Sequence, residues 1–225
     1  MPFNVVIPVF PGVTQLDFTG PAQLFAYAPD TKVHVVAASR DPIATDSGFS
    51  VCASATFDNC PDAQLLCVPG GPGVFDAIGD QQLLNFVRRQ AERAEHIHSV
   101  CTGMFVLGAV GLLNGKKATS HWGYVEAIAT CGAIYTPGRV VVDGKLMTAG
   151  GVTSGIDYGL TAIAHVFGEA AAKKVQLVLE YDPHPPFEGG HPSRASEETK
   201  ASVRDFYLTA TEKMNAALMA AFELE

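Results

Sequence analysis

The sequence is short of positive charge and lacks any long apolar segment. Lysine and arginine number 15 against 23 aspartates and glutamates, which gives a formal net charge of -8 at pH 7. This acidic balance disfavours nucleic acid and anionic membrane surfaces as partners. The longest uncharged apolar run, about residues 100–113, is too short to cross a bilayer. The opening MPFNVVIPVF has no basic region of the kind that begins a signal peptide.

Cysteine is present, but without the spacing of a disulfide framework or a thiolate zinc site. The five cysteines are Cys52, Cys60, Cys67, Cys101 and Cys131. An odd number at irregular spacing argues against a disulfide scaffold and favours a reducing, cytoplasmic compartment. The chain has no C-x-x-C pair, and His184 and His191 make no convincing metal set, so we expect no metal site.

Short apolar runs alternate with helical patterns along the chain. Near-continuous hydrophobicity, typical of a sheet buried on both faces, predicts strands at residues 4–10, 32–38, 64–71 and 95–100. Helices are predicted at residues 16–27, 80–94, 103–112, 122–131, 153–167, 169–180 and 196–223. Residues 138–151 indicate a hairpin that turns at Asp143-Gly144. This order predicts an α/β fold with a mostly parallel sheet and helices on both faces.

A segment rich in proline and glycine, residues 181–193, divides the chain. Residues 1–180 would form the α/β domain, and residues 181–225 an arm followed by one helix. One face of that helix carries a largely apolar stripe: Val203, Tyr207, Ala210, Met214, Ala217 and Ala221. The stripe needs a surface to cover, either this domain or a partner subunit.

Cys101 stands where a predicted strand passes directly into a helix. The strand ends at Val100, and Gly103 is small enough for a sharp turn and for close helix packing. The positive end of a helix dipole lowers the pKa of a thiol and favours the nucleophilic thiolate. The arrangement resembles a nucleophile elbow. A buried structural cysteine is the alternative, which fits Cys67 inside a strand and Cys131 near a helix end better.

Two further segments follow strands and would meet Cys101 at the carboxyl edge of the sheet. Asp17 is either a helix cap or solvated acid, or an acid that faces Cys101. In the second case, desolvation would raise its pKa and let it donate a proton. Gly70 and Gly71 form a simple turn, or their N–H groups stabilise a developing negative charge.

Three more residues are candidates for lining the pocket. Thr102 supplies a hydroxyl and an N–H beside the nucleophile. His121 follows a short strand and is either a structural residue or part of the pocket wall. Gly150 ends another strand, where it would let a helix begin close to the site or would serve packing alone.

The ordered motifs "PGG", "SVCTG", "GLLNGKKATSHW" and "LMTAGG" resemble the ThiJ/PfpI superfamily over about residues 4–180. The resemblance implies a flavodoxin-like α/β sandwich, a cysteine on a nucleophile elbow, and usually a homodimer. In such a dimer we expect residues 181–225 to pack on the partner. Protease and deglycase branches commonly have Cys-His at the elbow and a Glu near the first helix. Thr102 and Asp17 stand there instead, which argues against those activities.

Within the superfamily, "QLDFTGP", "CTG", "ATSHW" and "LEYDPHPPFEGG" together resemble the isonitrile hydratase branch. This resemblance implies that Cys101 is the nucleophile and Asp17 its acid partner. The substrate would be a small isonitrile, hydrated to an N-substituted formamide through a covalent thioimidate on Cys101. Such a reaction requires no metal or organic cofactor.

Two alternatives remain open. Similar domains fused to AraC-type DNA-binding regions act in regulation, so a non-enzymatic sensor is the first. The acidic charge and the short segment after Glu180 disfavour direct DNA binding by this chain. A redox-stress protein that uses oxidation of Cys101 is the second, because a thiolate at a helix start is susceptible to oxidation.

Overall fold

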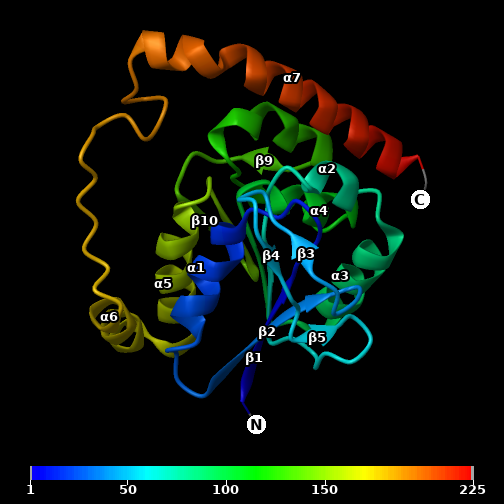
Figure 1. Cartoon of the computed structure of the whole chain (residues 1–225), viewed down its shortest axis with the longest axis vertical. Coiled ribbons are helices and arrows are strands. Elements are labelled where there is room, and N and C mark those ends of the chain that lie inside the picture. The colour runs from blue at the N-terminus through cyan, green and yellow to red at the C-terminus, as the bar shows by residue number, and fades with distance from the viewer. Residues whose placement is uncertain (1, 224–225) are drawn as a thin grey trace.

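The computed structural model describes residues 2–223 and has a seven-stranded sheet at its centre (Figure 1). The strands are β1 (Phe3–Pro8), β2 (Thr31–Ala37), β5 (Ala55–Thr56), β6 (Leu65–Val68), β7 (His96–Val100), β10 (Val140–Asp143) and β11 (Leu146–Ala149). Their order in the sheet is β10-β11-β7-β6-β1-β2-β5. Only the β10–β11 hairpin is antiparallel. The carboxyl ends of β1, β6, β7 and β11 therefore meet at one edge.

Helices lie on both sides of this sheet (Figure 1). On one side α1 packs against α5, and α5 against α6; α3 and α4 lie on the other side. The helices are α1 (Gln15–Phe25), α2 (Val74–Ala77), α3 (Gln81–Arg93), α4 (Met104–Ala109), α5 (Ser154–Phe167), α6 (Glu169–Val178) and α7 (Glu197–Phe222). Two 3₁₀ segments complete the set: η1 (Cys101–Gly103) and η2 (Trp122–Cys131). The predicted parallel sheet with two helical layers is confirmed.

The structure differs from the sequence prediction mainly in short elements. Two small sheets are present: β3 (Ile43–Ala44) with β4 (Ser50–Val51), and β8 (Lys117–Ala118) with β9 (Ile134–Tyr135). Strand β8 is the short strand expected before His121. The other three strands were not predicted, because two residues are too few to display a period. The predicted helix at 122–131 is a 3₁₀ segment, and the one at 103–112 is shortened to η1 followed by α4.

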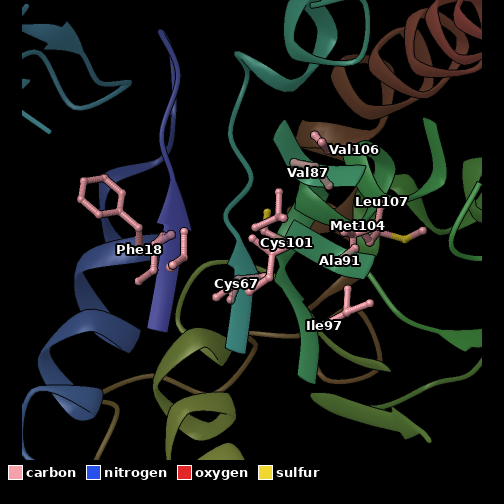
Figure 2. Close-up of a cluster of buried hydrophobic side chains, with 14 of the residues drawn as sticks. Phe18, Cys67, Val87, Ala91, Ile97, Cys101, Met104, Val106 and Leu107 are labelled. Carbon is pink, nitrogen blue, oxygen red and sulfur yellow. The ribbon is translucent and has the colours of Figure 1, made fainter. Parts of the chain in front are cut away.

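The core around the site consists of apolar side chains from β6, β7 and the helices on one face. All four residues of β6 are buried, and so is every residue of α4. Figure 2 shows Cys67 and Cys101 among these side chains, with Met104 and Leu107 beside them. Burial on both faces explains why the strands read as continuous apolar runs. None of the helices within residues 2–223 combines the length and apolar character needed to cross a bilayer.

The C-terminal segment leaves the α/β domain as an arm and returns as a helix (Figure 1). Residues 181–196 form no helix or strand, and α7 then packs across η2, α4 and α2 of the same chain. Ala210, Met214 and Ala221 of the predicted stripe are buried there. The stripe thus has a surface within its own chain. The homodimer, and packing of this helix on a partner, stay predictions.

Candidate active site

Cys101 occupies a strained turn at the carboxyl end of β7. Its φ is +58°, a left-handed conformation that costs a non-glycine residue on the order of 1–3 kcal/mol. Two backbone contacts hold the turn. The Cys101 N–H donates to the Gly150 carbonyl oxygen at 3.0 Å, and the Cys101 carbonyl accepts from Ser120 Oγ at 2.9 Å. The strand–turn–helix arrangement predicted for an elbow is confirmed.

Two glycines let this turn press against the loop that follows β6. A Cβ atom on Gly103 would lie 2.2 Å from the carbonyl oxygen of Val68. A Cβ on Gly70 would lie 2.5 Å from the Thr102 nitrogen and 2.9 Å from Asp17 Oδ2. Any side chain at either position would separate the elbow from the acid. The glycines therefore set the distance between the two loops.

Asp17 lies in the first turn of α1 and is fully buried. Its Oδ2 atom accepts a hydrogen bond from the Gly70 N–H at 3.0 Å, and its Oδ1 atom has no hydrogen-bond partner within residues 2–223. Burial raises the pKa of Asp17 to about 7, although Gly70 and the Cys101 thiol both act in the opposite direction. A substantial share of the molecules therefore carries a neutral acid here at neutral pH.

Cys101 titrates differently from the sequence-based expectation. Burial raises the pKa of its thiol well above the ordinary value, and the adjacent Asp17 carboxylate raises it further. The backbone of Val152 and the backbone and hydroxyl of Thr102 oppose these effects. The predicted lowering is wrong because desolvation of a thiol that is only 6% exposed disfavours the charged thiolate. Cys101 is therefore a thiol at neutral pH, beside an acid that is partly protonated.

The glycine loop positions the neighbours of this pair. The Gly70 N–H is engaged by Asp17, and the Gly71 N–H donates to Thr102 Oγ1 at 2.9 Å. Thr102 Oγ1 in turn donates to the Gly71 carbonyl oxygen at 3.3 Å. Both N–H groups are thus occupied within the protein. In this arrangement they orient Asp17 and Thr102, and they are not available to stabilise a developing negative charge.

His121 and Gly150 lie on the other side of Cys101. His121 Nδ1 accepts from the Gly123 N–H at 3.1 Å and caps η2, and burial lowers the pKa of His121 to about 4. A Cβ on Gly151 would lie 2.3 Å from the His121 ring. A cavity of about 520 Å³ adjoins this region, bordered by Gly150, Val152 and His121 among others. His121 is therefore a neutral imidazole at the border of this cavity.

The structure brings every predicted site residue to this one edge and adds three that the prediction missed. Ser120 belongs to the motif "ATSHW", and its position beside His121 is the signal that could have identified it. Tyr124 and Tyr207 belong to an aromatic cluster above the site. The sequence pattern places Tyr207 only in the apolar stripe of its helix. Within residues 2–223 no group of three or more His, Cys, Asp or Glu is arranged to hold a metal ion.

Sequence comparison assigns the class of protein. Residues 3–165 match the DJ-1/PfpI family, and the chain belongs to that family. The solved structure of a ThiJ/PfpI family protein from Pseudomonas syringae superposes with a TM-score of 0.94 at 39% identity. The superposition covers 97% of this chain and 91% of that one. The flavodoxin-like fold implied by the sequence motifs is therefore confirmed.

The curated relatives with functional names include an enzyme and a transcriptional regulator. The isonitrile hydratase of Pseudomonas putida is 46% identical over 195 residues, which cover 87% of this chain and 86% of that protein. The HTH-type transcriptional regulator CdhR of Pseudomonas aeruginosa is 29% identical over 150 residues, 65% of this chain and 44% of that protein. The first relative matches this chain nearly end to end, whereas the second has more than half of its length outside the match.

Proposed function

We propose that this protein hydrates isonitriles to N-substituted formamides, with Cys101 as nucleophile and Asp17 as the proton-transferring acid. The near full-length similarity to the Pseudomonas putida isonitrile hydratase supports the activity. The observation that carries the mechanism is the buried Asp17 carboxyl, with its raised pKa, beside the Cys101 thiol. No imidazole stands at position 102, so Asp17 is the group that exchanges protons with the sulfur.

The first half of the reaction joins sulfur to the isonitrile carbon. The carbon of R–N≡C carries the lone pair, and it becomes electrophilic when Asp17 protonates it. The resulting Asp17 carboxylate takes the proton from the Cys101 thiol, and the sulfur then forms a bond to the carbon. The product is R–N=CH–S–Cys101, a thioimidate, and Asp17 is protonated again. A neutral pair suits this step because the net change is addition of S–H to one carbon.

The second half releases the product with water. Water adds to the thioimidate carbon while the nitrogen gains a proton, which gives a tetrahedral carbon bearing OH, NHR and sulfur. The C–S bond then breaks, the sulfur regains a proton through Asp17, and R–NH–CHO leaves. The Val152 and Thr102 groups, which favour the thiolate form of Cys101, support departure of the sulfur. Each turnover consumes one water and regenerates both protonated groups.

The test is direct observation of product and intermediate. The protein is incubated with phenyl isonitrile, and N-phenylformamide is followed by chromatography. Mass spectrometry of the parent, quenched with acid during turnover, is expected to find an adduct of the substrate mass on the peptide that contains Cys101. Turnover in the parent with no adduct on Cys101 at any quench time, or turnover in Cys101→Ala, would contradict the covalent route.

The similarity to the regulator CdhR supports a second candidate, a non-enzymatic sensor. A sensor would bind a small molecule at the same crevice without consuming it. The incubation above separates the two functions. If the protein binds the isonitrile but forms no formamide during a prolonged incubation, the sensor is favoured. Formation of many equivalents of formamide per protein would exclude the sensor as the main role.

A further inference from the structure

An aromatic cluster forms where α7 crosses η2. The Tyr207 ring of α7 stacks on His121 with 5.3 Å between ring centroids and lies 4.5 Å from the centroid of Trp122. Tyr124 of η2 meets Tyr207 edge to face at 5.9 Å. Helix α7 thus adds one aromatic ring to three that η2 and the residue before it supply.

The cluster lies directly over the elbow. His121 follows Ser120, whose hydroxyl holds the Cys101 carbonyl. Burial raises the pKa of Tyr124 to about 12, and charge on Cys101 contributes to the raised pKa of both Tyr124 and Tyr207. Both phenols are therefore within electrostatic range of the sulfur. His121, which Tyr207 stacks on, borders the cavity that Gly150 and Val152 also line.

The Tyr207 ring packs directly against the backbone of η2 at Gly123. A Cβ atom on Gly123 would lie 2.2 Å from the Tyr207 ring, so only glycine admits the ring at this depth. One turn further along α7, Thr211 Oγ1 donates to the Gly123 carbonyl oxygen at 2.8 Å. Thr130 and Asn215 are joined by a second hydrogen bond of 2.7 Å. These contacts fix the rotation and register of α7 and hold Tyr207 toward the site.

We propose that Tyr207 is a specificity-determining residue: with Tyr124 it presents an aromatic wall to Cys101 that selects substrates carrying a flat aryl substituent. The proposal rests on the proposed isonitrile hydration for the reaction it serves. Aromatic rings favour stacked and edge-to-face contacts with other rings. His121 and Trp122, the two rings that Tyr207 contacts, border the cavity of about 520 Å³, which has room for a phenyl group. The neutral His121 leaves the wall without a charge that would attract an ionic substituent.

The test compares phenyl isonitrile with ethyl isonitrile as the ratio of their kcat/KM values. We expect Tyr207→Ala to lower this ratio roughly 3- to 10-fold, the range expected for loss of one aromatic contact. Tyr207→Phe keeps the ring and is expected to keep the parental ratio. Gly123→Ala leaves Tyr207 intact but displaces its ring, and should lower the ratio as Tyr207→Ala does. Met219→Ala, an exposed position on the same helix, is the matched control.

A second readout is independent of hydration. The rates at which iodoacetamide and N-phenyl iodoacetamide alkylate Cys101 are measured by peptide mapping, and Tyr207→Ala should lower the phenyl preference here as well. Parental ratios in Tyr207→Ala in both assays would overturn the proposal, as would equal losses in Tyr207→Phe and Tyr207→Ala. If the parent turns over no isonitrile, the proposed function fails, and the alkylation ratio alone decides whether the wall selects aryl groups.

Discussion

Strands β6 and β7 are neighbours in the sheet, and each is associated with a buried cysteine of different character. Cys67 lies within β6, fully buried, and burial raises the pKa of its thiol to about 12. Cys101 lies just past the end of β7, at a positive φ, and its thiol pKa is raised as well. Burial and a raised pKa therefore do not distinguish a structural thiol from a candidate nucleophile.

The difference lies in what each sulfur faces. The Cys67 thiol interacts with the hydroxyl of Tyr158, which is itself buried and bonded to His98 at 3.0 Å. Cys101 faces a neutral acid, Asp17, and its backbone borders a cavity through Gly150. A thiol becomes useful in catalysis when a proton acceptor and a substrate can both reach it. The strand end provides that access, and the strand interior does not.

The largest expected effect separates the two cysteines by substitution. Cys101→Ala should abolish isonitrile turnover, because no other group forms the thioimidate. Cys67→Ala should keep turnover close to that of the parent and lower the free energy of unfolding by about 1–2 kcal/mol through the cavity it leaves. Formamide formation and urea denaturation measure both. A Cys67→Ala variant that is folded but inactive would contradict the assignment of Cys67 as a structural cysteine.

Removing the Asp17 acid should leave Cys101, like Cys67, without a group that exchanges protons with its sulfur. Asp17→Asn keeps an acceptor for the Gly70 N–H but deletes the proton, and it should slow turnover on the order of 10²- to 10⁴-fold. The turnover rate of Asp17→Glu should lie between those of Asp17→Asn and the parent, since the carboxyl is kept but displaced. Steady-state kcat/KM values decide this. Parental rates in Asp17→Asn would remove Asp17 from the mechanism.

The buried acid should also be visible in the pH dependence of stability. The pKa of Asp17 rises from 3.8 to about 7 on folding, so between these values the folded state binds more protons than the unfolded state. Stability from this group is present at low pH and is lost as the pH rises from about 4 to 7, in total on the order of 4 kcal/mol. Urea titrations should show that loss in the parent and not in Asp17→Asn.

The control for this comparison is Asp205→Asn, which removes an exposed acid on α7. Its stability should follow the parental curve with pH. Superimposable curves for the parent and Asp17→Asn would mean that Asp17 is ionised in the folded protein and does not serve as the acid.

The smallest expected effect concerns the backbone at the two cysteines. Glycine accommodates the positive φ at position 101, so Cys101→Gly should be more stable than Cys101→Ala by about 1 kcal/mol. In the extended strand at position 67 the order should reverse, with Cys67→Gly less stable than Cys67→Ala by about 0.5–1 kcal/mol. Urea midpoints of the four variants measure this. The same sign at both positions would argue against strain at the elbow.

Most of the sheet and its helices could be predicted because their patterns are long. Strands β1, β2, β6 and β7 appear as continuous apolar runs, and the hairpin turn follows from Asp143-Gly144. The strand of two residues at Ala55–Thr56 carries no such signal. The 3₁₀ character of η2 was also out of reach, because helical periodicity over ten residues does not separate a 3₁₀ segment from an α-helix.

The sequence by itself determined where the candidate nucleophile stands. An apolar run that ends at Val100, followed by a cysteine and then Gly103, specifies a strand, a turn and a close-packed helix through local sterics alone. Placing Asp17 and the glycine loop at the same edge follows from the parallel order of the strands.

Only the tertiary structure decided how these groups behave. The protons held by Cys101 and Asp17 depend on how deeply both are buried and on their mutual distance, which sequence spacing does not contain. Sequence spacing also does not contain the hydrogen bond from the Gly71 N–H to Thr102, or the packing of the Tyr207 ring against Gly123. These are contacts between residues far apart in the chain, and packing in three dimensions selects them.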